Sequence, residues 1–453
     1  MCYAIPGKVT AFKENKVVVD YFGEERFAYN NEYIKVKVGD YIYAQGGFVI
    51  DIVPQKEAIE ILEFWKETFF NLRDIDLRLS GLSGKENVLK KTALILDKAL
   101  EGKNLKFEEL LYLFSLKEES ELNYLYKVAN FIRQKYHKNA CCVHGIIEFS
   151  NYCIRDCFYC GIRKSNLEIE RFRLKEEEIL KVVKEAVKNY GFKSLVLQSG
   201  EDPYYNVDKL SYLIKKILKE NAVLLFISVN EVGEEGLRKF YRAGARGALI
   251  RFETGDPFLY KKFHPNDNLE ERLAEIEIAK KIGFLVLTGG LIGLPGQNEE
   301  SILKDILLAK KLEPEMYSFG PFLSHPQTPL KEKESPTASL VLRCLAILRI
   351  VDPYGKILVT SALETLKADG GREKGFMAGA NSVMLNLTPE KYRLLYQIYP
   401  DRIYERVPVD LQIKQVIDDL QKLGRAPTDL GIRTVFPQTG GTGGDGASLK
   451  ECQ

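Results

Sequence analysis

The pattern of apolar and polar residues divides the chain into a strand-rich beginning, a helical middle and a long part in which strands and helices alternate. Up to about residue 51, short stretches alternate apolar and polar positions between Gly, Asn and Asp turns, which is typical of a small antiparallel barrel. Strands are expected there over 16–22, 26–29, 33–38 and 41–43. Apolar residues at helical spacing then predict helices over 57–77, 87–100, 107–114 and 120–136.

From residue 145 onwards, strand and helix patterns alternate eight times over about 240 residues, which fits an α/β fold with a (β/α)8 barrel. Strands are expected over 145–149, 194–199, 222–229, 247–252, 284–293, 316–319, 357–360 and 382–385. Helices are expected over 175–190, 207–220, 234–243, 268–282, 298–312 and 337–351. In such barrels the chemistry takes place at the carboxyl ends of the strands. The polar clusters that follow these strands are therefore the candidate site.

These patterns predict four regions. Residues 1–80 form a small β-barrel with a helix, residues 81–144 a helical connector, and residues 145–436 the large barrel, closed by a last helix over 410–423. Residues 437–453 are Gly-rich and poor in core-forming residues, so we expect them to be disordered.

Composition narrows the class of protein. Of the 453 residues, 45% are hydrophobic and 28% charged, as in soluble globular proteins. A net charge of +2 gives no electrostatic reason to expect nucleic acid or an acidic membrane as partner. No apolar run reaches the ~18–20 residues of a membrane span, and the first residues lack a signal-peptide pattern. Eight cysteines in such a chain favour a reducing cytoplasm and metal or redox chemistry over disulfides.

Three of those cysteines lie together directly after the first strand of the large barrel. Cys153, Cys157 and Cys160 have C-x3-C-x2-C spacing in a polar loop. Three thiolates on one loop can hold three irons of a cubane iron–sulfur cluster and leave the fourth iron open to a substrate or cofactor. A zinc site would recruit a fourth Cys or His nearby, but the next His is His264. Buried structural cysteines would not cluster in a polar loop. The spacing therefore predicts a [4Fe–4S] cluster.

Other polar residues follow later strands. Gly200 and Glu201 follow the second strand, where they expose backbone groups and a carboxylate. Arg251 and Glu253 follow the fourth, and their burial is costly unless they bind a ligand or each other. A structural salt bridge is the alternative for that pair. Arg272, on the next helix, could reach a carboxylate.

The cysteine loop, with Tyr159 before its last cysteine, resembles the signature of the radical S-adenosylmethionine (SAM) superfamily. The resemblance implies a [4Fe–4S] cluster whose open iron chelates the amino and carboxylate groups of SAM. It also implies reductive cleavage of SAM to a 5′-deoxyadenosyl radical, with a reductant such as ferredoxin or flavodoxin.

Within this superfamily, residues from about 107 to 436 resemble the HydE family of maturases, which help to build the FeFe-hydrogenase active site. The matching segments are 147–151, 198–205, 251–257, 293–297, 320–322, 325–326, 370–373 and 392–400. By position, the resemblance implies SAM contacts from Tyr159, Ser199, Gly200, Glu201, Glu253, Arg272 and Leu294. It implies substrate contacts from Arg251, Thr360, Ser361 and Tyr392.

The sequence departs from that family at three positions. Phe252 stands where the family has a His, His144 where it has an Arg, and a further Arg is missing near Gly247. The loss of positive donors weakens the case for an anionic iron complex as substrate. It favours the alternative of a mutase or synthase acting on a small amino-acid-like molecule, as in the methylornithine synthase and biotin synthase families.

The first nine residues resemble the start of the HypC/HupF family of hydrogenase maturation chaperones, and the likeness extends over roughly residues 1–80. In that family the Cys after the initiator Met carries an iron with cyanide and carbonyl ligands, together with a partner protein. The resemblance implies that Cys2 is an iron ligand and that this domain docks a maturation partner. The alternative is that Cys2 is incidental, and Gln45 stands where the family usually has a His.

Together these features predict a cytoplasmic radical SAM enzyme that acts on a small molecule or iron complex in assembling an iron–carbonyl/cyanide hydrogenase site. Two alternatives stay open. One is the mutase or synthase already described. The other is a non-catalytic carrier or scaffold that holds an iron complex on Cys2.

Overall fold

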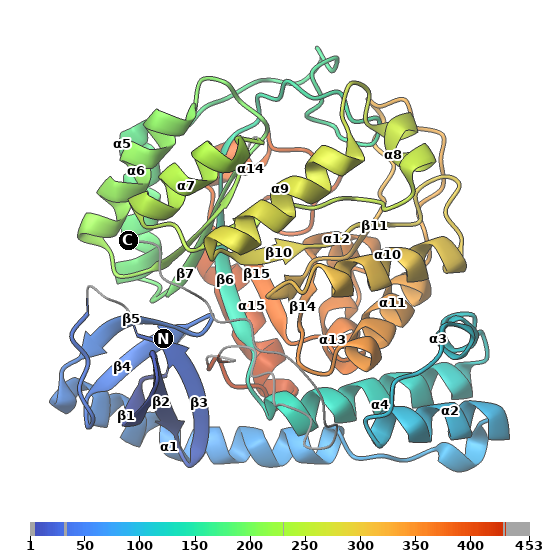
Figure 1. Cartoon of the computed structure of the whole chain (residues 1–453), viewed down its shortest axis with the longest axis horizontal. Coiled ribbons are helices and arrows are strands. Elements are labelled where there is room, and N and C mark those ends of the chain that lie inside the picture. Colours follow the sequence, from blue (N-terminus) through green and yellow to red (C-terminus); the bar gives the residue numbers. More distant parts are fainter. Residues whose placement is uncertain (1–4, 31–33, 230, 429–430, 432–453) are drawn as a thin grey trace, which may run out of the picture.

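The computed structural model describes residues 5–30, 34–229, 231–428 and 431. Cys2 and the segment 437–453 lie outside the described residues. Figure 1 shows a large barrel surrounded by helices, a smaller barrel against one end of it, and helices α1 to α4 along the same end.

The small domain is a closed five-stranded barrel, as expected, although one pair of neighbouring strands in it is parallel and not antiparallel. Its strands are β1 (Gly7–Lys13), β2 (Lys16–Tyr21), β3 (Glu24–Tyr29), β4 (Tyr41–Gln45) and β5 (Phe48–Val53), in the spatial order β1-β2-β3-β5-β4. Alternate residues of these strands point inward, and the buried Val9, Val17, Val19, Ile42 and Val49 form the core.

The predicted strand over 33–38 is not formed by its described residues, which begin at Ile34. The Asp40 carboxylate accepts a hydrogen bond from the Lys37 N–H (2.7 Å), and the Gly39 N–H donates to the Val9 carbonyl (2.8 Å). These bonds fold the segment into a turn against β1, and Gly39 has a φ of +96°, a conformation that favours glycine. Two strands of the barrel, β1 and β5, were not among those expected from the alternation pattern.

The helical middle part matches the predicted helices. It consists of α1 (Gln55–Leu79), the 3-10 turn η1 (Lys85–Asn87), α2 (Lys90–Leu100), α3 (Phe107–Phe114) and α4 (Glu119–His137). A buried ion pair between Arg133 of α4 and Asp76 of α1 (2.7 Å) joins the small domain's helix to the connector. Arg425, from the end of the chain, adds a second contact to Asp76 (3.2 Å).

The large barrel has eight parallel strands in one closed sheet, as the alternating pattern predicts. They are β6 (Cys142–Ser150), β7 (Ser194–Ser199), β8 (Leu224–Ser228), β9 (Gly247–Leu249), β10 (Leu285–Thr288), β12 (Met316–Tyr317), β14 (Lys356–Val359) and β15 (Ser382–Asn386). The predicted strand over 284–293 is divided, because β11 (Leu291–Ile292) leaves the barrel and pairs with β13 (Gly320–Pro321).

Helices follow the strands and surround the sheet. They are α5 (Glu176–Lys188), α6 (Val207–Glu220), α7 (Gly233–Ala243), α8 (Pro257–Phe263), α9 (Leu269–Ile282), α10 (Glu299–Lys311), α11 (Ala338–Val351), α12 (Ser361–Leu366), α13 (Gly371–Met377), α14 (Glu390–Arg393) and α15 (Val409–Lys422). The barrel is closed by hydrogen bonds between β9 and β10 and not by the predicted helix over 410–423, since α15 packs against β15.

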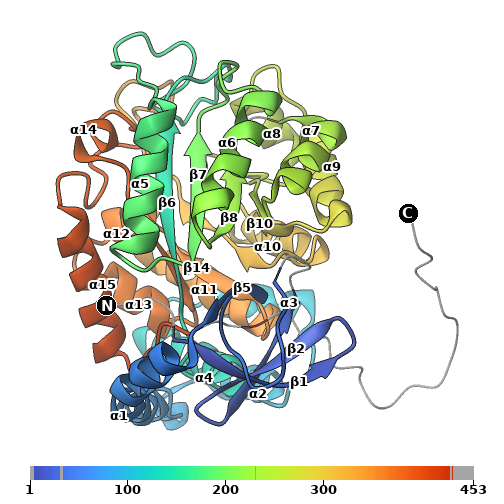
Figure 2. The ribbon, with the colours of Figure 1, turned by 90° about the vertical axis from the view of Figure 1, so that its left-hand side faces the viewer.

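Figures 1 and 2 place the small barrel and α1 to α4 at the end where the large barrel's strands begin. The loop after β6, which carries the three cysteines, lies at the opposite end. Among the described helices, none combines the length and the apolar character that a membrane crossing requires.

Candidate active site

A cavity of about 380 Å³ lies inside the large barrel, toward the carboxyl ends of its strands. Loops that follow different strands supply its walls, so the residues named from the sequence converge although they are far apart in the chain. Those that line the cavity are Cys153, Cys157, Tyr159, Cys160, Ser199, Gly200, Glu201, Arg251, Glu253, Arg272, Thr360 and Ser361.

The cysteine loop is held by side chains that the sequence motif does not include. The Asn151 amide donates to the carbonyls of Glu170 and Leu395 (both 2.8 Å), and its oxygen accepts from the Phe172 N–H (2.7 Å). The Arg171 guanidinium donates to four carbonyls of the loop, those of Asn151, Ile162, Arg163 and Asn166. These bonds fix the loop before any cofactor binds.

Gly200 allows the loop after β7 to approach the cysteine loop. A Cβ at this position would lie 2.3 Å from the Tyr152 carbonyl oxygen and 3.0 Å from the Cys153 Cβ. Any other residue would separate the two loops. The neighbouring Ser199 hydroxyl donates to the Gly200 carbonyl (2.7 Å).

The three thiols are costly to ionise in the protein alone. Burial is the main cause that raises the pKa of Cys153 and Cys157, and it raises that of Cys160 to about 12. Repulsion between thiolates adds to this for Cys157 and Cys160, whose pKa values the neighbouring cysteines raise, whereas the charge of Glu201 raises the pKa of Cys153. Iron would offset both effects, since metal binding deprotonates a coordinating thiol. Within the described residues, no three Cys, His, Asp or Glu side chains converge to hold a single metal ion. The triad therefore fits a multinuclear cluster better than a zinc site.

Tyr159 is fixed beside the cysteines by His264. Its hydroxyl lies 2.8 Å from the His264 Nε2, and burial lowers the pKa of that imidazole to about 4. The Tyr159 ring packs against an apolar cluster that contains Leu294 and Phe322. Leu294 belongs to that cluster and is not among the cavity-lining residues, so its predicted cofactor contact is not supported by its position.

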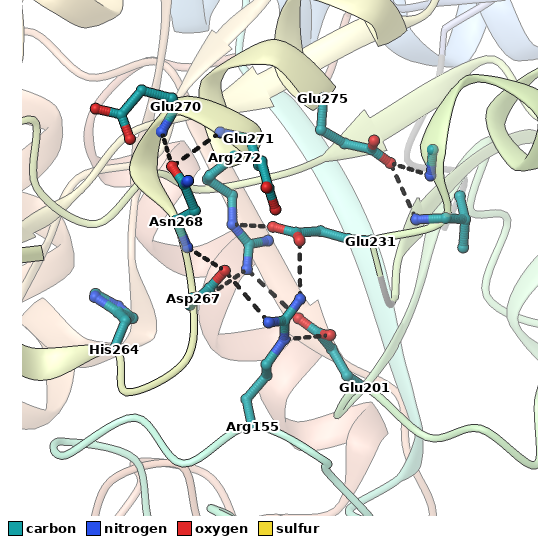
Figure 3. Close-up of polar contacts among 12 residues, drawn as sticks. Arg155, Glu201, Glu231, His264, Asp267, Asn268, Glu270, Glu271, Arg272 and Glu275 are labelled. Carbon is teal, nitrogen blue, oxygen red and sulfur yellow. Dashed lines mark hydrogen bonds and ion pairs between the residues drawn. The ribbon is translucent and has the colours of Figure 1, made fainter. Parts of the chain in front are cut away.

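A compact group of charges forms one wall of the cavity (Figure 3). Arg155 contacts Glu201 (2.7 Å) and Glu231 (2.8 Å). Arg272 contacts Glu231 (2.7 Å) and Glu201 (3.4 Å), and both guanidinium groups reach Asp267 (3.3 and 3.4 Å). Three carboxylates thus share two guanidinium groups. Burial raises the pKa of Glu231.

Sequence reasoning missed Arg155, Glu231 and Asp267. Arg155 lies within the cysteine motif, and Glu231 follows the third barrel strand, so both positions are functional ones by the rule for strand ends. Asp267 precedes the predicted helix over 268–282 and carries no comparable signal.

Arg251 and Glu253 form an ion pair (2.9 Å) at the end of the fourth strand, which is the structural alternative named above. Both also line the cavity. Burial is the main cause that raises the pKa of Glu253. Glu253 has a φ of +63°, a strained conformation for a side chain of this kind, and strain of this sort is common at functional sites.

The expected substrate residues separate into two groups. Thr360 and Ser361 begin α12 and line the cavity, where the Ser361 hydroxyl lies 2.7 Å from that of Tyr399. Tyr392 is not among the lining residues, so its expected substrate contact stays a prediction. Its hydroxyl donates to Glu178 (2.8 Å), and its ring stacks on Phe172.

A second ion pair was not foreseen. The Arg402 guanidinium contacts both oxygens of Glu148 (2.5 and 3.1 Å), and the Asn386 amide donates to the same carboxylate (2.8 Å). All three residues line the cavity. A Glu inside the apolar segment 145–149 was a usable signal, because a carboxylate is seldom buried without a partner. Nothing in the sequence marks Arg402.

The three positions that depart from the HydE pattern lie away from the cavity lining. Phe252 is fully buried beside Phe319. At Gly247 a Cβ would lie 1.7 Å from the Phe226 ring, and the His144 ring meets the same phenylalanine edge-on, 5.6 Å between centroids. The Phe226 ring therefore fills the space beside two of these three positions.

Three family models match the chain. The Radical SAM superfamily model matches residues 147–309, the Biotin and Thiamin Synthesis associated domain model residues 311–424, and the HupF/HypC family model residues 1–65. The [FeFe] hydrogenase maturase subunit HydE of Thermotoga maritima is 38% identical over 333 residues, which cover 74% of this chain and 94% of that protein. The chain belongs to the radical SAM superfamily. Members are enzymes that use a [4Fe–4S] cluster and SAM, and these are the cofactors of this chain.

Other relatives define the range of chemistry. The 3-methylornithine synthase of Methanosarcina acetivorans is 32% identical over 333 residues, which cover 73% of this chain and 93% of that protein. The crystal structure of a methylornithine synthase matches with a TM-score of 0.67 and 29% identity, over 74% of this chain and 98% of that one. The crystal structure of the hydrogenase maturase HydG matches with a TM-score of 0.58 and 23% identity, over 70% of this chain and 71% of the HydG chain. This match shows a shared fold.

Proposed function

We propose that this radical SAM enzyme acts in the maturation of the FeFe-hydrogenase active site. The observation that carries the proposal is the 38% identity to a HydE maturase over nearly that protein's whole length. A domain of the HupF/HypC family in the same chain supports it, because two segments independently point to hydrogenase assembly.

In this proposal Cys153, Cys157 and Cys160 hold the cluster. The donor set fits, since three thiols line one cavity and lack a fourth protein ligand of the same kind among the described residues. A cluster held there would supply one electron to bound SAM, and cleavage of the carbon–sulfur bond would give methionine and a 5′-deoxyadenosyl radical. The Asn151 and Arg171 hydrogen bonds hold the loop in place for this role.

The charged wall would receive the amino and carboxylate groups of SAM. Glu201 offers an acceptor to an ammonium group, and Arg272 offers donors to a carboxylate. The wall contains one carboxylate more than it has guanidinium groups, so it can accept hydrogen bonds from an ammonium group while its guanidinium groups donate to a carboxylate. Ser199, Gly200, Tyr159 and Glu253 would contact other parts of the cofactor.

The substrate would lie deeper, between Arg251, Thr360 and Ser361 and the Glu148–Arg402 pair. These residues offer hydroxyls and paired charges. The paired charges that line the cavity favour a second candidate function, a mutase or synthase that acts on a small amino acid. A zwitterion matches paired charges better than an anionic complex does. The methylornithine synthase relative, covered over 93% of its length, supports this candidate.

The partners follow from the chemistry. The enzyme needs a one-electron reductant such as ferredoxin or flavodoxin, and we propose a maturation partner for residues 1–80, with the cytoplasm as its location. Cys2 would then hold an iron complex, a role that rests on its place after Met1.

The test is infrared spectroscopy of the enzyme isolated anaerobically from its native host, beside a Cys2→Ala variant. Iron-bound carbonyl and cyanide bands that disappear in the variant would place the complex on Cys2. Bands that persist would place it in the large barrel. An enzyme that cleaves SAM but shows no such bands would overturn the maturation proposal in favour of the small amino-acid substrate. In parallel, Cys157→Ala should reduce 5′-deoxyadenosine formation to background, and retained activity would contradict the cluster assignment.

A further inference from the structure

The beginning of the large barrel's strands is covered by the small domain. One apolar cluster joins Tyr43, Ile50 and Val53 of the small domain and Ala58 of α1 to side chains of five barrel strands. The barrel side chains in this cluster are Val196, Leu224, Phe226, Leu285, Leu287, Met316 and Leu358. The ammonium group of Lys193, just before β7, lies over the Tyr43 ring at 4.1 Å from its centroid. Both ribbon views show the small barrel at this end of the large barrel (Figures 1 and 2).

The turn between β4 and β5 makes the deepest contact. The Gln45 amide donates to the Cys142 Sγ (2.8 Å), and Cys142 is the first residue of β6. At Gly46 a Cβ would lie 2.9 Å from Leu224 Cδ2 and 3.1 Å from Leu285 Cδ1, at the starts of β8 and β10. The turn therefore touches β6, β8 and β10, which are alternate strands of the barrel. Since alternate strands fill one layer of such a barrel, the turn reaches across its end.

The reaction cavity lies directly above this contact. Ile146, Leu249, Leu358 and Met384 line the cavity, and all four also pack in or against the apolar cluster. The cavity and the small domain are thus separated by this apolar cluster, to which β8 and β10 each contribute two residues. Apolar side chains offer no polar partners to water or to a charged ligand.

We infer that the small domain is the fixed floor of the reaction chamber, so that SAM and substrate enter, and products leave, only at the carboxyl ends of the strands. Two consequences follow. The β4–β5 turn, including Gln45, is not available to another protein. Any transfer between the small domain and the cavity passes around the outside of the barrel and not through its floor. This inference holds for either substrate and does not depend on the proposed function.

The test uses alkylation of Cys142 in the anaerobic full-length holoenzyme with N-ethylmaleimide, followed by peptide mass spectrometry. Cys142 is 1% exposed and is covered by Gln45, whereas Cys344 is fully buried in α11 and serves as an internal reference. With a fixed floor, Cys142 should react as slowly as Cys344. A Cys142 that reacts tenfold or more ahead of Cys344 in the unaltered enzyme would overturn the inference, because the small domain would then move away from the barrel.

A pair of glycine variants tests the turn itself. Gly46 (φ +59°) and Gly39 (φ +96°) both have positive φ, so an Ala introduces backbone strain at each, and more at Gly39, whose φ lies outside the left-handed α region of L residues. A Cβ at Gly39 meets nothing within 4 Å, whereas one at Gly46 meets the barrel. Gly46→Ala should speed the alkylation of Cys142 at least tenfold, and Gly39→Ala should leave it unchanged. Equally slow alkylation in the two variants would contradict the contact assigned to the turn, and equally fast alkylation would contradict a fixed floor. If Gly46→Ala does not fold, Gln45→Ala, which uncovers Cys142 without altering the glycine, replaces it.

Discussion

The two ends of the large barrel are built from the same eight strands but differ in nearly every physical property. At the carboxyl ends, the cavity wall contains ion pairs such as Arg272–Glu231 and the strained Glu253. At the amino ends, strand residues such as Phe226 and Leu285 pack into an apolar layer against a second domain. Chemistry and stability are thus separated along the strands, as is usual in this fold. The strain and buried charge of one end are tolerated because the other end holds the strands together.

The largest effect on stability is expected at the floor. Phe226 is 1% exposed, and its ring fills the space above Gly247. Phe226→Ala should lower the free energy of unfolding by about 3–5 kcal/mol, because a large cavity would remain in a packed core. The KM for SAM should not change, since Phe226 is not among the cavity-lining residues. Urea unfolding and 5′-deoxyadenosine formation measure the two quantities.

Phe64→Ala is the control for that experiment, because Phe64 is 72% exposed on α1 and its loss should leave stability nearly unchanged. A tenfold rise in the KM for SAM in Phe226→Ala, with normal stability, would contradict the separation of the two ends.

At the cavity wall, a substitution should weaken the binding of SAM, which a substitution at the floor should leave unchanged. Arg272→Ala removes a partner of Glu231 and Glu201. SAM binding should weaken by about 100-fold, since loss of one member of a buried charge pair costs about 2–5 kcal/mol. The matched control is Arg238→Ala, which breaks an exposed pair with Glu234 on α7 and should change neither binding nor activity. SAM binding is measured by equilibrium dialysis on the anaerobic enzyme. Equal affinities in the two variants would mean that the charged wall does not bind SAM.

The sequence predicts most of this architecture, for reasons that particular segments make clear. Segments 107–114 and 194–199 match α3 and β7 because their apolar periods are strong and their ends carry turn residues. The cysteine motif was visible because its ligands lie within eight residues of one another in the chain. Arg402 and Glu148 lie 254 residues apart, and no local pattern links them. The contact of Gln45 with Cys142 likewise depends on how two domains pack, which local periodicity does not encode.

The stability of the fold should depend on pH because of His144, a buried residue of β6 beside Phe226 in the floor. Burial, helped by the charge of Lys356, lowers the pKa of His144 from 6.5 to about 3, and its Nε2 has no hydrogen-bond partner among the described residues. The unfolded chain therefore binds a proton below pH 6.5 that the folded protein does not bind until about pH 3. His144 therefore does not lower the free energy of unfolding above pH 6.5. As the pH falls below 6.5, protonation of the unfolded chain lowers the free energy of unfolding, by about 2 kcal/mol at pH 5.

Urea unfolding at pH 7 and pH 5 measures this effect. His144→Gln should lose less stability than the unaltered protein between the two values, because glutamine does not titrate. The same loss in both proteins would show that other groups cause the acid sensitivity. Activity at pH 7 should be retained, since His144 is not a cavity-lining residue.

The smallest effect is expected at Tyr392, which the resemblance implies as a substrate contact but which does not line the cavity. Its hydroxyl donates to Glu178 outside the cavity, so Tyr392→Phe removes one partly buried hydrogen bond and should cost about 1 kcal/mol of stability. SAM cleavage and product formation should be unchanged. Ser361→Ala is the comparison, because Ser361 lines the cavity and contacts Tyr399, and its loss should weaken substrate binding. If Tyr392→Phe instead impairs turnover as Ser361→Ala does, the cavity extends to Tyr392 during the reaction, and the carboxyl end of the barrel is larger than its resting shape.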